Sequence, residues 1–199
     1  MPDWSVILAG YMLGSVPFAF LLARRGGVDI RVTGSGNVGA TNVLRATGAS
    51  RGVAVLLLDV AKGSAAICVA DLAGVGLAAR AATGVAAIVG HVYPVWLRFH
   101  GGKGVAVACG VFSLLLPAAT AVAAVVFSAV VWATRYVSLG SVAATVIVPP
   151  TAYLTGAPAA LVLTASSVAV LIVFRHRSNL ARIRAGTERR LGRSVKLSH

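Results

Sequence analysis

The chain has 199 residues, of which 58% are hydrophobic and only 12% are charged, with a mean hydropathy of +0.88. Soluble domains carry about 25% charged residues, and one core of this size cannot bury so much apolar surface, so a soluble globular enzyme and a disordered chain are both excluded. The 18 Lys and Arg against 5 Asp and Glu give a net charge of +13. This charge favours an anionic membrane face or an anionic substrate, while the hydrophobicity argues against nucleic acid as a partner. We therefore expect an all-α, polytopic membrane protein.

Apolar stretches recur along the whole chain. A transmembrane helix needs about 20 mostly apolar residues, with some spread. Seven stretches are candidates, and they cover residues 4–23, 52–79, 82–97, 104–116, 118–134, 137–154 and 157–174. The first is preceded by Asp3 and by no basic segment, which favours a spanning helix over a cleavable signal. The second is over-long and contains Asp59 and Lys62, which could pair with each other or take part in catalysis, and Asp71, for which we predict no role.

The distribution of basic residues predicts the orientation. With seven spans the connecting segments alternate sides, and all but two of the 18 basic residues fall on one side. The exceptions are Lys62, which lies inside a span, and Arg80, which lies on the other side. Because basic segments stay in the cytoplasm, we expect the N-terminus outside and the C-terminus inside. Residues 1–199 are predicted to form a single membrane domain with a basic cytoplasmic tail from about residue 175, which could bind anionic headgroups.

The first polar cluster on the predicted cytoplasmic side is residues 31–45, whose sequence is RVTGSGNVGATNVLR. Glycines let backbone N–H groups approach an anion, and Ser, Thr and Asn side chains add neutral donors. Residues 40–45 are expected to be helical, so the glycines could deliver an anion to a helix N-terminus, where Arg45 would grip phosphate with two N–H groups. The candidate site residues here are Ser35, Gly36, Asn37, Gly39, Thr41, Asn42 and Arg45.

Two other interpretations apply to this cluster. Residues 34–39 match the G-x-G-x-x-G pattern of dinucleotide-binding folds, with Asp59 twenty residues after Gly39. That pattern requires a preceding strand and a βαβ unit, whereas here one predicted span precedes it and another follows it. A flexible glycine-rich linker is the second alternative. Linkers seldom carry Asn37, Thr41, Asn42 and Arg45 in one helical phase.

The second polar cluster lies in residues 90–106, where Gly101, Gly102, Lys103 and Gly104 lead directly into an apolar stretch. Backbone amides with one lysine can form an anion-binding nest. The segment is not a nucleotide-binding P-loop, because Leu97 and Gly104 occupy the positions that require Gly and Ser or Thr. A glycine-rich joint between helix and loop is the alternative. His91 is expected to be buried, either as a hydrogen-bonded core residue or as a catalyst.

The third polar cluster is divided between two parts of the chain. Ser138 and Ser141 begin the sixth predicted span, and His176 and Asn179, three residues apart, follow the seventh on one helix face. The alternatives are packing roles for the serines and an interfacial anchor for His176. Cys68 and Cys109 are expected to be small buried hydrophobes. No Cys/His spacing fits zinc and the acidic residues are scattered, so neither a metal nor a cofactor is predicted.

Together these clusters resemble a known family, the bacterial integral-membrane acyl-phosphate:glycerol-3-phosphate acyltransferases of the PlsY type. The resemblance covers nearly the whole chain. Its motifs are GSVPF at 14–18, GSGNVGATN at 34–42 with Arg45, Asp59 with Lys62 and Gly63, His91 and Pro94, GGKGVA at 101–106, His176 with Arg177, Asn179, Arg182 and GTE at 186–188. These strings are long and unusual, so chance is a poor explanation.

The resemblance implies seven spans and transfer of a fatty acyl group from acyl phosphate to the 1-hydroxyl of sn-glycerol 3-phosphate. The products are lysophosphatidate and phosphate, and the step is the first acylation of phospholipid synthesis in the bacterial plasma membrane, with neither acyl-CoA nor acyl carrier protein as donor. The resemblance also implies that residues 101–104 bind glycerol 3-phosphate and that Ser35 and Arg45 are needed for activity. Glu188 would have a structural role, and Ser141, His176 and Asn179 would complete the polar pocket. Lys103, His176 and Asn179 join Ser35 and Arg45 as catalytic candidates. The general base that takes the proton of the glycerol 3-phosphate hydroxyl could be His176 or, as we favour, a substrate phosphate.

We expect the protein to act as a monomer in the bilayer. The competing hypothesis is a transporter for a phosphorylated solute, which glycine-interrupted spans and intramembrane charges would suit. No inverted repeat is evident, and the polar clusters gather at one face rather than at the midplane. A purely structural scaffold would leave three anion-binding loops on the same side without a reason.

Overall fold

The computed structural model describes residues 2–192, and within this range it is helical and contains no strand. The predicted all-α class is therefore confirmed for this part of the chain. The elements are α1 (Asp3–Ser15), α2 (Phe18–Arg25), α3 (Ala40–Thr47), α4 (Ala49–Leu72), α5 (Leu77–Val92), the 3-10 helix η1 (Val95–Leu97), α6 (Val105–Leu115), α7 (Pro117–Thr134), α8 (Val137–Leu154), α9 (Ala159–Arg175) and α10 (Arg177–Arg184).

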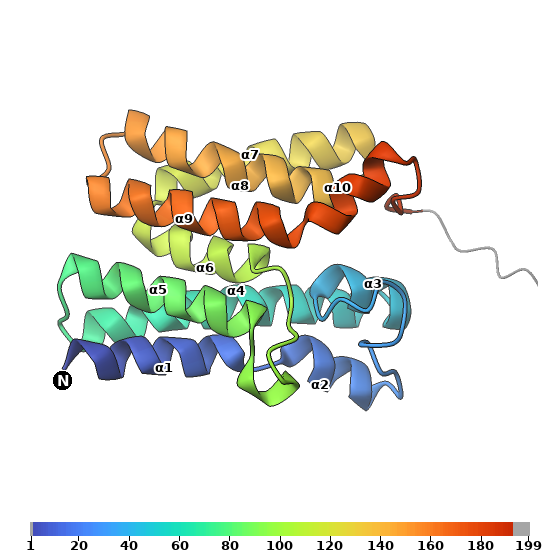
Figure 1. Cartoon of the computed structure of the whole chain (residues 1–199), viewed down its shortest axis with the longest axis horizontal. Helices are drawn as coiled ribbons and strands as arrows, with labels where there is room; N and C mark the ends of the chain where they lie inside the picture. The colour runs from blue at the N-terminus through green and yellow to red at the C-terminus, as the bar shows by residue number, and fades with distance from the viewer. Residues whose placement is uncertain (1, 193–199) are drawn as a thin grey trace, which may run out of the picture.

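The long helices lie side by side along one axis (Figure 1). Helices α1, α4 and α5 form one half of the bundle, α7, α8 and α9 form the other, and α6 lies between them. Helices α2, α3 and α10 gather at the same end, which we call the site end (Figure 1). The predicted polar clusters are thus brought to one end of the bundle.

Small residues let the helix backbones approach closely, as is common in membrane bundles. A Cβ atom at Gly14 would lie 1.9 Å from the carbonyl oxygen of Ala87, and one at Gly110 would lie 2.0 Å from that of Val60. These contacts join α1 to α5 and α6 to α4. Because no larger side chain fits there, the glycines fix how near the helices at the core of the bundle can lie.

Four helical segments are long and apolar enough to cross a membrane: Asp3–Arg25, Ala49–Leu72, Pro117–Thr134 and Val137–Leu154. A fifth is added if α9 and α10, which meet at a bend of 53°, count as one span. Helices α5 and α6 have only 16 and 11 residues. Helix length and composition therefore support four or five of the seven predicted spans and a multi-pass membrane protein.

Several predicted boundaries differ from the structure. The stretch 52–79 is not one span, because α4 ends at Leu72 and a turn containing Gly74, at a φ of +66°, leads into α5. Hydropathy does not detect this turn, since its residues are as apolar as the helices beside it. Asp71 has a partner after all, because its carboxylate lies 2.6 Å from Nε of Arg80 across the turn.

Two further expectations need correction. The first predicted span matches the candidate span Asp3–Arg25, but it is not one continuous helix, because Pro17 has no N–H group and α1 ends at Ser15 before α2 begins. Cys68 and Cys109 are both exposed on the helix bundle rather than buried. The predicted span 137–154, by contrast, coincides with α8.

The basic C-terminal segment folds back onto the bundle at the site end. After α10, Leu191 N donates to the carbonyl of Arg135 at 2.7 Å, and Nε of Arg190 donates to the hydroxyl of Tyr136 at 3.1 Å. Residues 177–192 are thus part of the fold. Arg193 and Lys196, which the charge analysis assigned to this tail, lie outside the described residues.

Candidate active site

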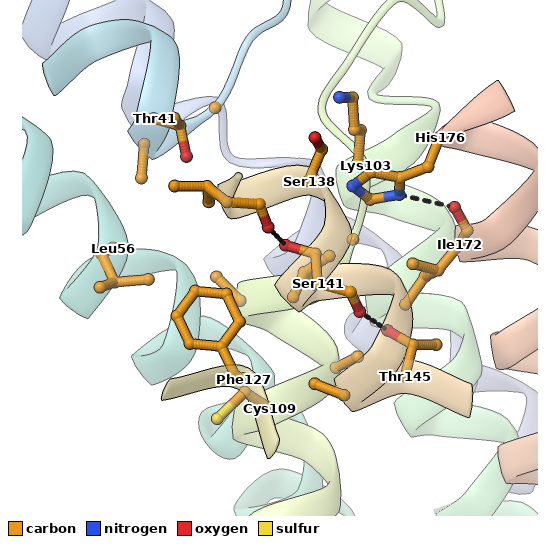
Figure 2. A pocket seen from close by; sticks show the side chains of 18 of the residues that line it. Thr41, Leu56, Lys103, Cys109, Phe127, Ser138, Ser141, Thr145, Ile172 and His176 are labelled. Carbon is orange, nitrogen blue, oxygen red and sulfur yellow. Dashed lines mark hydrogen bonds between the residues drawn. The ribbon is translucent and has the colours of Figure 1, made fainter. Parts of the chain in front are cut away.

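A cavity of about 610 Å³ lies at the site end, between the two halves of the bundle (Figure 2). Its polar part is built from all three predicted clusters and contains Ser35, Asn37, Gly39, Thr41, Asn42, Arg45, Lys103, Gly104, Ser138, Ser141, His176, Asn179, Arg182, Thr187, Glu188 and Arg189. Its apolar part extends between α4, α6, α7, α8 and α9, where Leu56, Cys109 and Phe127 line it. One cavity therefore combines a basic, hydrogen-bonding region with a hydrocarbon-like groove.

A chain of side-chain contacts connects the second and third clusters in the polar part. Nζ of Lys103 donates to Oδ1 of Asn179, and Nδ2 of Asn179 donates to Glu188 at 2.7 Å. Glu188 also accepts from the hydroxyl of Ser138 at 2.8 Å and from Nε of Arg182 at 2.7 Å. Asn179 is thereby held with its oxygen toward Lys103, and Glu188 neutralises part of the surrounding positive charge.

The pKa values of Lys103 and Glu188 in this network are both lowered, but for different reasons. Burial lowers the pKa of Lys103 to about 8, against the opposing attraction of Glu188, and neighbouring arginines lower it further. Burial raises the pKa of Glu188, but hydrogen bonds from Asn179, Ser138 and Arg182 outweigh this effect, so that the pKa is below its ordinary value. At neutral pH the network therefore holds one carboxylate among several cations.

Arg45 joins the first cluster to the C-terminal segment. It lies in the last turn of α3, is half-buried, and donates from NH2 to the carbonyl of Arg189 at 3.1 Å. The predicted helix 40–45 is confirmed as part of α3, whose first residue follows Gly39. Arg45 thus contributes a guanidinium group to the cavity together with Arg182, which the family motifs included, and Arg189, which the sequence analysis did not single out.

His176 lies at the break between α9 and α10, so it and Asn179 are not on one continuous helix, although both are buried and line the cavity. Its Nδ1 lies 2.8 Å from the carbonyl of Ile172, which accepts the proton of that nitrogen and leaves Nε2 as an acceptor (Figure 2). Burial, followed by the charge of Lys103, lowers the pKa of His176 to about 4. The imidazole is therefore neutral at neutral pH.

Asn42 lies at the cavity as predicted, and its side chain is also hydrogen-bonded within the first glycine loop. It is buried, and its Nδ2 donates to the carbonyls of Thr33 at 2.9 Å, Asn37 at 3.1 Å and Ile30 at 3.3 Å. Its Oδ1 accepts from the backbone N–H of Ser35 at 3.2 Å. These hydrogen bonds hold the glycine loop in place around the Asn42 side chain.

Gly101 and Gly102 also differ from the prediction of an anion nest. Their N–H groups donate to the carbonyls of Val92 and His91 at 3.1 Å each, and their own carbonyls accept from Arg175 at 3.3–3.4 Å. Neither glycine lines the main cavity, and Gly36 does not line it either. The amides of Gly101 and Gly102 are thus committed to the protein, whereas Gly104 and the first residues of α6 face the cavity.

Ser35, Thr41 and Ser141 lie at the cavity as predicted. The hydroxyl of Ser141 donates to the carbonyl of Val137 at 2.9 Å within α8. Within residues 2–192, no group of three His, Cys, Asp or Glu side chains could hold a metal ion. The dinucleotide interpretation of residues 34–39 is wrong, because α2 precedes this segment and α3 follows it, with no strand in the described chain.

The fold and the site define a multi-pass membrane protein with a basic, hydrogen-bonding pocket next to an apolar groove. The family model described as glycerol-3-phosphate acyltransferase matches residues 4–186. Relatives of that name are 45% identical in Halalkalibacterium halodurans (96% of each chain) and 46% identical in Geobacter sulfurreducens (90% of this chain and 93% of the relative).

Solved structures agree with the sequence relatives. The crystal structure of PlsY, an integral membrane glycerol 3-phosphate acyltransferase, in its glycerol 3-phosphate form has a TM-score of 0.92 at 38% identity over 96% of each chain. The lysophosphatidic acid form has a TM-score of 0.89. The chain therefore belongs to the glycerol-3-phosphate acyltransferase family of integral membrane enzymes. This membership confirms the predicted enzyme class and excludes the transporter and scaffold alternatives.

Proposed function

We propose that the chain transfers a fatty acyl group from acyl phosphate to the 1-hydroxyl of sn-glycerol 3-phosphate, releasing lysophosphatidate and inorganic phosphate. The observation that supports this best is the continuity of the cavity. A basic region suited to phosphate groups adjoins an apolar groove suited to an acyl chain. An acyl phosphate has this same division, with an anionic head on a hydrocarbon tail, and glycerol 3-phosphate adds a second phosphate at the basic end.

Binding of the phosphates is assigned to the cationic and donor groups of the polar part. Arg45 supplies a forked donor pair, and Lys103 a compact positive charge. Free N–H groups in the first turn of α6 and the hydroxyl of Ser35 add neutral donors. Gly39, Asn37, Thr41 and Ser141 line the remaining wall. In this assignment Asn42, Gly101 and Gly102 shape the two loops, and Asn179 and Glu188 hold Lys103.

The chemical step is direct acyl transfer. The 1-hydroxyl oxygen attacks the acyl carbonyl carbon, the bond from that carbon to the phosphate oxygen breaks, and the hydroxyl proton passes to a substrate phosphate. Phosphate is a good leaving group, so positioning and charge stabilisation supply most of the catalysis. His176 remains the alternative base, because its Nε2 is an acceptor facing the cavity. Its low pKa makes it a weak base, which favours the phosphate.

We further propose the finer topology that the charge pattern predicts. The seven spans are α1 with α2, then α4, α5, α6, α7, α8 and α9, and residues 1–199 act as one domain and as a monomer. The site end is assigned to the cytoplasm of the bacterial plasma membrane, with the N-terminus outside. The support is the concentration of arginines at the site end, against Arg80 at the opposite end, where it is paired with Asp71.

The proposal is tested with purified protein in detergent or a lipid mesophase. Palmitoyl phosphate and glycerol 3-phosphate are mixed with it, and both lysophosphatidate and phosphate are measured. We expect the two products in equal amounts, only when both substrates are present, and no product from palmitoyl-CoA. Acylation from palmitoyl-CoA instead would contradict the assigned donor, and no acylation from either donor by folded protein would contradict the proposed reaction.

A further inference from the structure

Three buried polar side chains have no part in the proposed chemistry, although two of them, Asp59 and His91, line the cavity. Asp59 and Lys62 lie on α4 and His91 lies near the end of α5, and they are 2%, 5% and 8% exposed. Nζ of Lys62 lies 2.9 Å from Oδ1 of Asp59, as the three-residue spacing allowed, and Nδ1 of His91 lies 3.6 Å from the same oxygen. Charged groups this deep in a membrane protein are costly and usually serve function.

One side of this cluster is attached to the break between α1 and α2. Nζ of Lys62 donates to the carbonyl of Val16 at 2.9 Å, directly before Pro17. Helix ends leave carbonyls without helical partners, and Lys62 satisfies one of them. The ion pair on α4 is therefore anchored to a fixed point of a second helix.

The other side of the cluster meets both glycine loops of the cavity. A Cβ atom at Gly102 would lie 2.2 Å from Nε2 of His91 and 2.8 Å from the carbonyl oxygen of Val38. The imidazole ring is thus held between Asp59 and the residue that precedes Lys103. Val38, which belongs to the first glycine loop, reaches the same point.

We infer that Asp59, Lys62 and His91 are positioning residues for glycerol 3-phosphate. Through Gly102 and Val38 they set the distance between Lys103 and the loop 34–39, the two parts of the chain that bind phosphate in the proposed function, on which this inference rests. The ion pair lies against one edge of the His91 ring, at 3.6 Å, and the opposite edge of the ring abuts both loops. None of the three takes a proton in the reaction. A shift of about 1 Å in such groups can lower the rate by roughly 100-fold.

The main test is His91→Gln, which removes the ring and leaves the ion pair of α4 intact. Affinity for glycerol 3-phosphate is measured by calorimetry without acyl donor, and KM and kcat are measured with palmitoyl phosphate. We expect affinity to fall by roughly tenfold or more, with KM rising accordingly and kcat changing much less. A purely structural role would instead reduce the folded fraction, lowering apparent kcat with KM unchanged.

The ion pair provides a second, independent set of variants. Asp59→Asn and Lys62→Met each leave one buried charge without its partner, whereas the double variant removes both charges. We expect the double variant to bind glycerol 3-phosphate better than either single variant. The matched control is Asp71→Asn, which breaks the other ion pair of α4 at the opposite end of the helix, and for which affinity should match that of the wild type.

The outcomes separate this inference from the proposed function. A wild-type protein that does not acylate glycerol 3-phosphate contradicts the proposed function. An active wild type whose His91→Gln variant keeps the wild-type KM and affinity overturns the positioning role. If His91→Gln does not fold, the variants of Asp59 and Lys62 provide the test. The inference is overturned if the single and double variants bind glycerol 3-phosphate as tightly as Asp71→Asn does. It is supported if the single variants bind more weakly and the double variant recovers part of the affinity.

Discussion

The ammonium group of Lys103 donates a hydrogen bond to the side-chain oxygen of Asn179, which joins the loop before α6 to the helix after α9. Asn179 is in turn held by Glu188. The position of Lys103 therefore depends on the C-terminal segment as well as on its own loop. The charges and hydrogen bonds around this contact determine how substitutions of Lys103, His176 and Glu188 should change activity and stability.

The pKa of Lys103 predicts an alkaline limit to substrate binding. Burial lowers this pKa to about 8, so the side chain is charged below that pH and loses its charge as the pH rises through it. We expect kcat/KM for glycerol 3-phosphate to fall over the same range, because this ratio reports the free enzyme. Lys103→Arg keeps its charge at higher pH and should move the fall upward. Identical alkaline limbs in both proteins would show that Lys103 is not the titrating group.

His176→Ala should keep part of the activity. The pKa of the imidazole is lowered to about 4 by burial and by the charge of Lys103, so the ring is neutral throughout the neutral range. A limb near pH 6–7 in the kcat profile should therefore come from the substrate phosphate, whose pKa is about 6, and should persist in His176→Ala. Profiles of both proteins test this. A well-folded but completely inactive His176→Ala variant would count against proton transfer to the substrate phosphate.

Gly102→Ala should raise the KM for glycerol 3-phosphate more than it lowers kcat. The added Cβ would meet Nε2 of His91 at 2.2 Å and the carbonyl of Val38 at 2.8 Å, so both loops must shift. Steady-state kinetics with each substrate varied in turn measures the effect. Gly76→Ala is the matched control, because no atom lies within 4 Å of its Cβ position. A rise in the KM for acyl phosphate instead would mean that the loops are assigned to the wrong substrates.

Glu188→Gln should lower thermal stability in detergent. The carboxylate accepts charge-assisted hydrogen bonds from Ser138, Asn179 and Arg182, and loss of its charge should cost about 2 kcal/mol. The control is Asp29→Asn, since the exposed pair of Asp29 with Arg31 contributes little. Equal unfolding temperatures for Glu188→Gln and the wild type would contradict the role assigned to Glu188.

The same comparison has a predicted pH dependence. The pKa of Glu188 is lowered in the folded protein, so its stabilisation is complete above the ordinary pKa of 4.5. It is lost as the pH falls through the lower, folded-state pKa. The difference in Tm between the wild type and Glu188→Gln should therefore be constant near neutral pH and shrink in acid.

The sequence predicted local structure well where a single residue marks a boundary. Pro117 begins α7 and Gly104 precedes α6, close to the expected ends, and α8 matches its predicted span. The end of α4 was misplaced, because the apolar turn after Leu72 carries no hydropathy signal. The glycine, serine and basic clusters were also correctly expected to meet on one side of the bundle.

Contacts between separate helices could not be predicted from the sequence. The pairing of Asp59 with Lys62 follows from their spacing, but the approach of His91 to Asp59 depends on how α4 and α5 pack. The use of the Gly101 and Gly102 amides by neighbouring carbonyls is likewise a tertiary feature. Motif spacing identifies residues of a site, but helix packing determines which of their polar atoms remain free to bind a ligand.

The most direct test that this cavity is the active site is phosphate release from palmitoyl phosphate and glycerol 3-phosphate by the wild type, Lys103→Ala and Arg45→Ala. Arg25→Ala serves as the control, because Arg25 is a basic residue at the same end of the bundle that does not line the cavity. We predict release that requires both substrates, persists in Arg25→Ala and is largely lost in the two cavity variants. Equal release from all four folded proteins would contradict the assignment of this cavity as the active site.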